Sequence, residues 1–242
     1  MTIQGILNTI SHRPWNLPAL SWSYYQEWND VVFMHWPVDL EELKKFVPNE
    51  LEIDTFDGTS WVSVVAFDME NVRLRYLPAF APVSNFHELN VRTYIRHKGK
   101  TGVYFLSIEG SKWLSCFIAK GLSEIPYRCS EMTRNEMMFS SLNTKLGNQL
   151  NLEYEIGASI QTKTNLDKWL TERYALAQDV ENEMLGFDIH HAEWPLRHVN
   201  IQMLEIQYPC FGTLISGMPP LAHYSKGVQV LAWEKVRTSQ LN

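Results

Sequence analysis

Apolar and polar residues alternate along much of the chain, as expected of β-strands whose two faces meet different surroundings. The clearest case is the segment NFHELNVRTY, residues 85–94. One of its faces carries Glu88, Asn90 and Arg92, and the other is mainly apolar. Two interpretations are open: either the polar face meets water, or it faces the interior of the fold.

Similar strand patterns are separated by tight turns. Asp57-Gly58 lies between two strand-like runs, a strong hairpin signal, and HKGKTG at 97–102 joins the segment above to the next strand in the same manner. The pattern predicts further strands in these segments: 21–36 (one or two strands), 103–110, 113–122, 136–145, 150–157 and 227–236.

Helical patterns are few and short. A helix is predicted just after residue 39, because Asp39 can accept a backbone N–H there, and Pro48 ends it. Residues 165–176 place apolar side chains on one helical face. A third short helix is expected before Pro14.

Strands that follow strands through tight turns predict a mainly β, α+β fold with a mostly antiparallel sheet. So many strands in one sheet should curl into a barrel or sandwich. Because no linker or change in composition divides residues 1–242, we expect a single domain.

Composition narrows the functional classes. The net charge is −6 and no basic stripe is present, which argues against nucleic acid as a partner. Three scattered cysteines fit a reducing compartment. The N-terminal residues lack the features of a signal peptide, and no apolar run is long enough to cross a bilayer. We therefore expect a cytoplasmic protein without a membrane partner.

Common catalytic and metal-binding motifs are absent. HELNV begins like a zinc-protease motif, but Val91 stands where the second histidine is required. His190 and His191 are adjacent and so do not share a strand or helix face. We expect neither a metal nor another cofactor.

Several segments resemble a known superfamily. VDLEELKKFVPNELEID and FIAKGLSEIPYRCS resemble two segments of acetoacetate decarboxylases, and NFHEL matches an aromatic-x-Glu strand between them. The phrases ELNVRTY, GVYF, LTERY and WPL are similar to those of the YqjF-like bacterial proteins, an uncharacterised family of the same superfamily. The resemblance implies a closed or nearly closed antiparallel barrel with flanking helices and an internal pocket.

The resemblance also implies that Glu88 faces the pocket, with Asn90 and Arg92 on its side of the strand. A buried carboxylate and guanidinium are costly unless they are paired, so these two charges would have to compensate each other. Glu88 is then a candidate catalytic residue, and Asn90 and Arg92 are candidate ligand-binding residues. The alternative remains a sheet surface with exposed charges.

The Schiff-base lysine of the decarboxylases has no counterpart here. In IPYRC, Tyr127 stands in the place of that lysine and Arg128 in the place of its neighbour. A phenol cannot form an imine. Tyr127 is a candidate catalytic residue through hydrogen bonding, or it simply packs, and Arg128 either binds a carboxylate or lies on the surface. A looser match puts Asn29 where a substrate-binding arginine is expected.

Lys120 is the nearest amine by sequence and lies in a segment predicted as a strand. If it points inward, it is a displaced nucleophile or binds an anion; otherwise it is a lysine of the barrel wall that reaches solvent or a carboxylate.

Three hypotheses about function follow from these features. The protein is an acid–base enzyme on a small oxo-acid or carbonyl compound, a non-enzymatic binder of a small anionic or aromatic ligand, or an interaction protein whose barrel is filled. A small-molecule ligand is thus the expected partner, and a homo-oligomer is compatible with the sequence.

Overall fold

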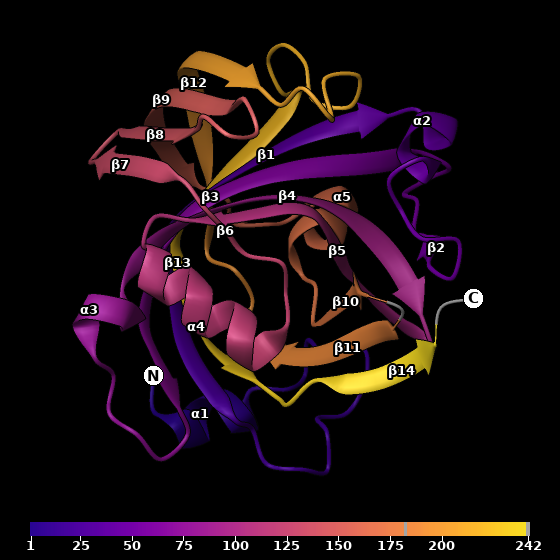
Figure 1. Cartoon of the computed structure of the whole chain (residues 1–242), viewed down its shortest axis with the longest axis vertical. Helices are drawn as coiled ribbons and strands as arrows, with labels where there is room; N and C mark the ends of the chain where they lie inside the picture. Colours follow the sequence, from indigo (N-terminus) through magenta and orange to yellow (C-terminus); the bar gives the residue numbers. More distant parts are fainter. Residues whose placement is uncertain (182, 241–242) are drawn as a thin grey trace.

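The computed structural model of the chain describes residues 1–181 and 183–240. In this part of the chain, fourteen strands join one sheet, and most neighbouring strands are antiparallel. Part of the sheet closes on itself as a ring (Figure 1), because β11 pairs with β13 as well as with β10. The predicted mainly β, mostly antiparallel fold is confirmed.

The ring follows the order β11, β10, β5, β4, β3, β1 and β13. Its strands are β1 (Tyr24–Val38), β3 (Ser60–Leu74), β4 (Phe86–His97), β5 (Lys100–Gly110), β10 (Ala175–Val180), β11 (Glu183–His190) and β13 (Leu221–Ala232).

Closure of the ring depends on a close approach between two strands. β5 and β10 are parallel neighbours. A Cβ atom on Gly102 would lie only 2.6 Å from the carbonyl oxygen of Ala175. A glycine at this position therefore lets the β10 backbone reach β5.

A second group of strands continues the sheet beyond β13 in the order β12, β9, β8 and β7 (Figure 1). These are β12 (Leu196–Gln207), β9 (Asn148–Ser159), β8 (Met138–Asn143) and β7 (Glu131–Asn135). The short strands β2 (Glu52–Ile53), β6 (Arg128–Cys129) and β14 (Val236–Gln240) pair with β4, β5 and β11.

The helices are short. They are α1 (Ile3–Asn8), α2 (Leu40–Lys44), α3 (Ala81–Ser84), α4 (Trp113–Ser123) and α5 (Asn165–Thr171). The Asp39 side chain caps α2 as expected, by accepting a hydrogen bond of 2.9 Å from the N–H of Glu42. No helix among the described residues is long and apolar enough to span a bilayer.

The predicted strand at 113–122 is wrong, because this segment is helix α4. Ser115, Ile118, Ala119 and Leu122 line one cavity, and their spacing is that of a helical face. The helix ends at Ser123, and the following residue, Glu124, caps it with a left-handed φ of 65°. In Figure 1, α4 lies across the opening of the ring.

The turn predictions are confirmed. Asp57 and Gly58 both have positive φ, and Phe56 and Thr59 exchange two backbone hydrogen bonds around them. The segment between β4 and β5 turns at Lys98 and Gly99, which also have positive φ. Residues 21–36, for which one or two strands were expected, belong mainly to the single long strand β1.

Strand β4 is buried on both faces. Leu89 and Val91 pack in a core that includes Phe139 and Leu152 of the second group of strands. Glu88, Asn90 and Arg92 on the opposite face are also buried. The polar face of this strand therefore points into the ring, and its apolar face meets the core between the two groups of strands.

Candidate functional site

The interior of the ring contains a cavity of about 190 Å³. Strands β1, β3, β4 and β11 contribute to its wall, and α4 covers it from one side. Its lining is mainly apolar and includes the aromatic side chains of Trp28, Phe33, Phe67, Phe86, Phe105, Phe187 and Trp194. Against this apolar wall the few polar groups, which include Glu88, Asn90 and Arg92, are the candidates for chemistry.

Glu88 is the centre of a small hydrogen-bonded group. Tyr127 donates a hydrogen bond of 2.7 Å to its Oε2 atom, and the Asn90 amide donates one of 3.1 Å to its Oε1 atom. Asn90 reaches Glu88 because residues two apart on a strand share a face. Tyr127 belongs to the loop between α4 and β6. The hydrogen bond to Glu88 therefore forms only if this loop passes close to β4.

Burial dominates the electrostatics of this group. It raises the pKa of Glu88 to about 7, although Tyr127, Asn90 and the charge of Arg92 act in the opposite direction. The pKa of Tyr127 is raised well above its usual value by burial and by the neighbouring carboxylate. Glu88 can therefore exist in both protonation states near neutral pH, whereas Tyr127 remains a hydrogen-bond donor.

Two arginines line the same cavity. Arg92 lies over the ring of Phe33, with its guanidinium carbon 5.5 Å from the ring centroid. Arg173 is held by Asp54, which accepts a hydrogen bond of 2.8 Å from its Nη1 atom. The pKa of both guanidiniums is lowered, chiefly by burial.

Lys120 and Arg128 do not reach the cavity. Both are exposed, and neither is among its lining residues. Of the two alternatives for Lys120, the structure excludes the inward one, because in α4 this lysine lies one residue away from the cavity-facing positions. Among the described residues that line the cavity there is no lysine, so a Schiff-base amine is missing from its wall.

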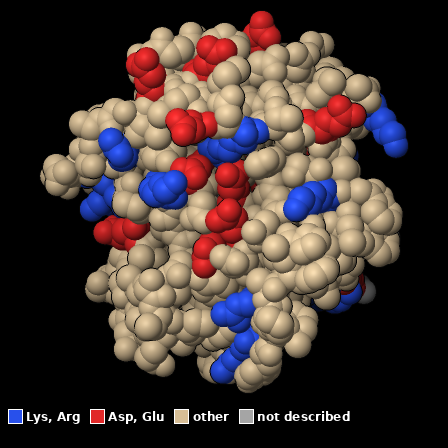
Figure 2. Space-filling view, turned by 90° about the vertical axis from the view of Figure 1, so that its left-hand side faces the viewer, with Lys and Arg blue, Asp and Glu red and all other residues tan. Residues whose placement is uncertain are grey.

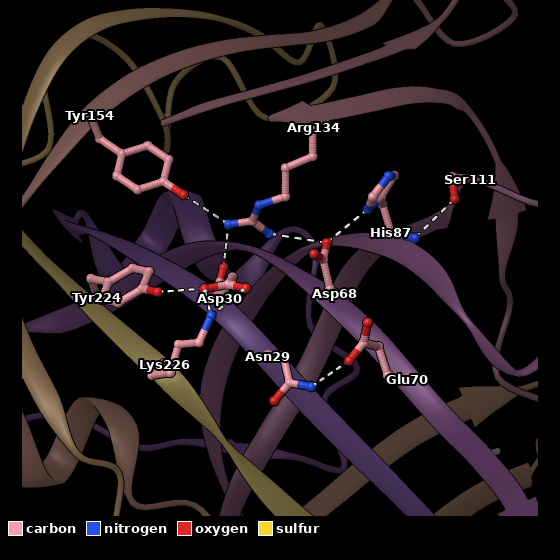
Figure 3. A network of polar contacts seen from close by, with 10 residues as sticks. All are labelled: Asn29, Asp30, Asp68, Glu70, His87, Ser111, Arg134, Tyr154, Tyr224 and Lys226. Carbon is pink, nitrogen blue, oxygen red and sulfur yellow. Dashed lines mark hydrogen bonds and ion pairs between the residues drawn. The ribbon is translucent and has the colours of Figure 1, made fainter. Parts of the chain in front are cut away.

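Asn29 belongs to a different polar cluster, which Figure 3 shows. There Asn29 donates a hydrogen bond of 2.7 Å to Glu70, and Arg134 of β7 contacts Asp68 at 3.2 Å. Asp68 in turn accepts a hydrogen bond of 2.7 Å from His87 if that histidine nitrogen is protonated. None of these residues lines the cavity, and the cluster links the second group of strands to the ring.

Sequence reasoning missed the cavity role of Arg173 and of two tryptophans, Trp28 and Trp194. Arg173 lies just after α5, where it donates hydrogen bonds to Asp54 and to the Trp169 carbonyl. Arg173 also lines the cavity, because the chain passes along the cavity wall after α5. No local motif marks any of these three residues.

The arrangement suits acid–base chemistry. A carboxyl group with a pKa near 7 is well matched to proton transfer at neutral pH. The Arg92 guanidinium is buried beside the same largely apolar cavity, where its charge acts strongly.

Acidic and basic side chains are interspersed on the face shown in Figure 2 and form no continuous basic stripe there. Among the described residues, no group of three or more histidine, cysteine or acidic side chains has the geometry of a metal site.

Solved structures of low sequence identity share the fold. An acetoacetate decarboxylase-like enzyme from Sphingomonas wittichii RW1 superimposes with a TM-score of 0.62 at 15% identity, covering 92% of this chain and 95% of that chain. The enduracididine biosynthesis enzyme MppR, complexed with pyruvate, gives a TM-score of 0.62 at 10% identity, covering 92% and 93%.

Sequence comparison gives a nearer relationship. The chain is 34% identical over 227 residues to the uncharacterized protein YqjF of Bacillus subtilis (strain 168), covering 90% of this chain and 93% of that protein. The family model DUF2071, described as an uncharacterized conserved protein, matches residues 25–229. The chain therefore belongs to the DUF2071 family, within the acetoacetate decarboxylase-like fold.

Proposed function

We propose that this protein is an acid–base enzyme that moves a proton at the carbon next to the carbonyl of a small, largely apolar compound. The observation that carries the proposal is Glu88, a carboxyl group with a pKa of about 7 that lies in an aromatic cavity and accepts hydrogen bonds from Tyr127 and Asn90. A carboxyl group in such surroundings is a common sign of a functional site.

In the proposed step, the Glu88 carboxylate takes the proton from the carbon and becomes a carboxylic acid. The electron pair of the broken C–H bond moves toward the carbonyl carbon, and the carbonyl oxygen becomes an enolate. Arg92 stabilises that negative charge, and Tyr127 holds the Glu88 side chain in place. Return of the proton to the same or a neighbouring atom completes the reaction without a cofactor.

The fold comparison gives supporting context. MppR, which shares the fold, is described as complexed with pyruvate, a small oxo-acid. The absence of a lysine from the cavity wall described here favours proton transfer over Schiff-base decarboxylation.

Deuterium exchange tests this proposal. Pyruvate, 2-oxobutanoate, phenylpyruvate and acetoacetate are incubated with the protein in D₂O, and loss of the carbon-bound proton is followed by NMR. We expect exchange above background for at least one compound, with a loss of about 10²-fold or more in Glu88→Gln.

Glu70→Gln is the matched control, because Glu70 also accepts a hydrogen bond from an asparagine but lies outside the cavity. The proposed enzymatic function would be rejected if no compound shows exchange, or if exchange is undiminished in Glu88→Gln.

A non-enzymatic binder is the second candidate, and the aromatic lining favours it. Such a wall holds an apolar ligand without any need for chemistry. Stoichiometric binding of a compound that is neither exchanged nor consumed would select this function.

A further inference from the structure

Arg173 has more hydrogen-bonding capacity than the protein uses. It is 5% exposed, its Nε atom donates to the Trp169 carbonyl at 2.6 Å, and Nη1 donates to Asp54. Its guanidinium carbon lies 4.3 Å from the centroid of the Trp169 ring and 4.8 Å from that of Tyr94. The side chain is thus fixed, yet its Nη2 atom is buried without a hydrogen-bond partner.

Arg92 has the same feature. It is 9% exposed, and its Nε atom is buried without a partner. Asn90 lies two residues before Arg92 on the same strand face, and its Oδ1 atom also has no hydrogen-bond partner. Buried polar atoms without a partner are rare, and each of these three belongs to a side chain that lines the cavity.

Positive charge exceeds negative charge beside the cavity when Glu88 is protonated. Asp54 is shared between Arg173 and Arg96, which contacts its other oxygen at 2.7 Å. Among the described residues, Glu88 is the carboxylate that acts on Arg92, and burial raises the pKa of Glu88 to about 7. The positive charge of Arg92 also lowers the pKa of Arg173. An added negative charge between the two arginines would offset this excess.

We propose that Arg92 and Arg173 together bind the carboxylate of a small ligand whose apolar body, of the size of a single aromatic ring, lies against Trp28, Phe33 and Trp194. Guanidinium groups suit carboxylates because their planar N–H donors match the two oxygens. The unpartnered Asn90 oxygen suits a hydroxyl or enol group near that carboxylate.

The cavity volume limits the size of the ligand. About 190 Å³ is below the roughly 300–1,000 Å³ of sites for drug-sized molecules. This inference rests on the proposal that the cavity is the functional site, and it narrows the substrate class to aromatic or similarly apolar carboxylic acids.

Probes without a ketone separate the binding of a carboxylate from proton transfer next to a ketone. Phenylacetate, 3-phenylpropanoate and 4-phenylbutanoate, each with its neutral amide, are titrated by calorimetry and by the intrinsic fluorescence of the nine tryptophans, of which Trp28, Trp194 and Trp233 line the cavity. We expect at least one acid to bind, and to bind at least about tenfold more tightly than its amide. Arg92→Met and Arg173→Met should each weaken the acid by about tenfold or more and change the amide little.

Arg96→Gln is the matched control, because it removes the other arginine of Asp54 without touching the cavity. It should leave the preference for the acid unchanged, as should Lys120→Ala. If Arg173→Met does not fold, Arg92→Met and the comparison of acid with amide still decide the matter.

Equal binding of acid and amide, no binding of any acid, or a preference that survives Arg92→Met would overturn this inference. Because the probes have no ketone, binding without deuterium exchange would leave the carboxylate site intact while rejecting the enzyme. Deuterium exchange without a binding preference for acids over amides would support the enzyme and reject the carboxylate site.

Discussion

Tyr127 donates a hydrogen bond of 2.7 Å to Glu88 and thereby joins the loop after α4 to the face of β4 that points into the ring. In acetoacetate decarboxylases, the resemblance places the reactive lysine at the position of Tyr127. A phenol at this position orients and partly stabilises the Glu88 carboxylate, which changes the chemistry that the cavity can support.

Tyr127→Phe should raise the pKa of Glu88 above its value of about 7, because the lost hydrogen bond favours the ionised carboxylate. The titration of Glu88 is measured by carbon-detected NMR, and the alkaline shift should also appear in the pH profile of any activity. Tyr104→Phe is the control, since the Tyr104 hydroxyl bonds Asp179 and Tyr104 does not line the cavity. An unchanged or lower Glu88 pKa in Tyr127→Phe would contradict the prediction.

The contribution of Glu88 to the stability of the protein should fall as pH rises from about 4.5 to about 7, opposite to the contributions of His190 and His191, whose pKa values burial lowers to about 4. The folded state raises the pKa of Glu88 from 4.5 to about 7, so it binds more protons than the unfolded state in this range. The contribution of Glu88 is on the order of 3 kcal/mol, lost as the carboxyl group ionises. Glu88→Gln should abolish this part of the pH dependence in urea denaturation, whereas Glu52→Gln at an exposed position should not.

Asp54→Asn should destabilise the fold by about 3–5 kcal/mol, because it leaves the buried Arg173 charge without its carboxylate. Arg96→Gln breaks the other ion pair of Asp54, but the Arg96 side chain is 54% exposed. We expect that change to cost less than about 1 kcal/mol. Chemical denaturation of the three proteins measures both values, and similar losses in the two variants would show that burial does not distinguish the pairs.

Lys120 should form no imine with a carbonyl substrate. It is exposed on α4 and lies outside the cavity wall, so a reaction there would not use Glu88. Incubation with acetoacetate or acetopyruvate and borohydride, followed by peptide mass analysis, should show no stoichiometric adduct. An adduct that disappears in Lys120→Ala would revive a displaced-lysine mechanism.

Local sequence determined much of the strand and turn structure. Asp57-Gly58 and Lys98-Gly99 turn the chain because their backbones adopt positive φ with little dependence on distant residues. The alternation of residues 85–94 likewise put Glu88, Asn90 and Arg92 on one face before any partner strand was known. Asp39 similarly marked the start of α2.

Tertiary structure decided what those faces meet. Alternation cannot tell a face that meets water from one that meets a cavity, and only the pairing of β11 with β13 closes the ring around Glu88. Residues 113–122 carry both strand-like and helical spacing, and packing of Ser115 and Ile118 against the cavity selects the helix. Arg173 lines the same cavity as Arg92 although it lies about eighty positions further along the chain. No local pattern contains this relationship, because it depends on which strands become neighbours.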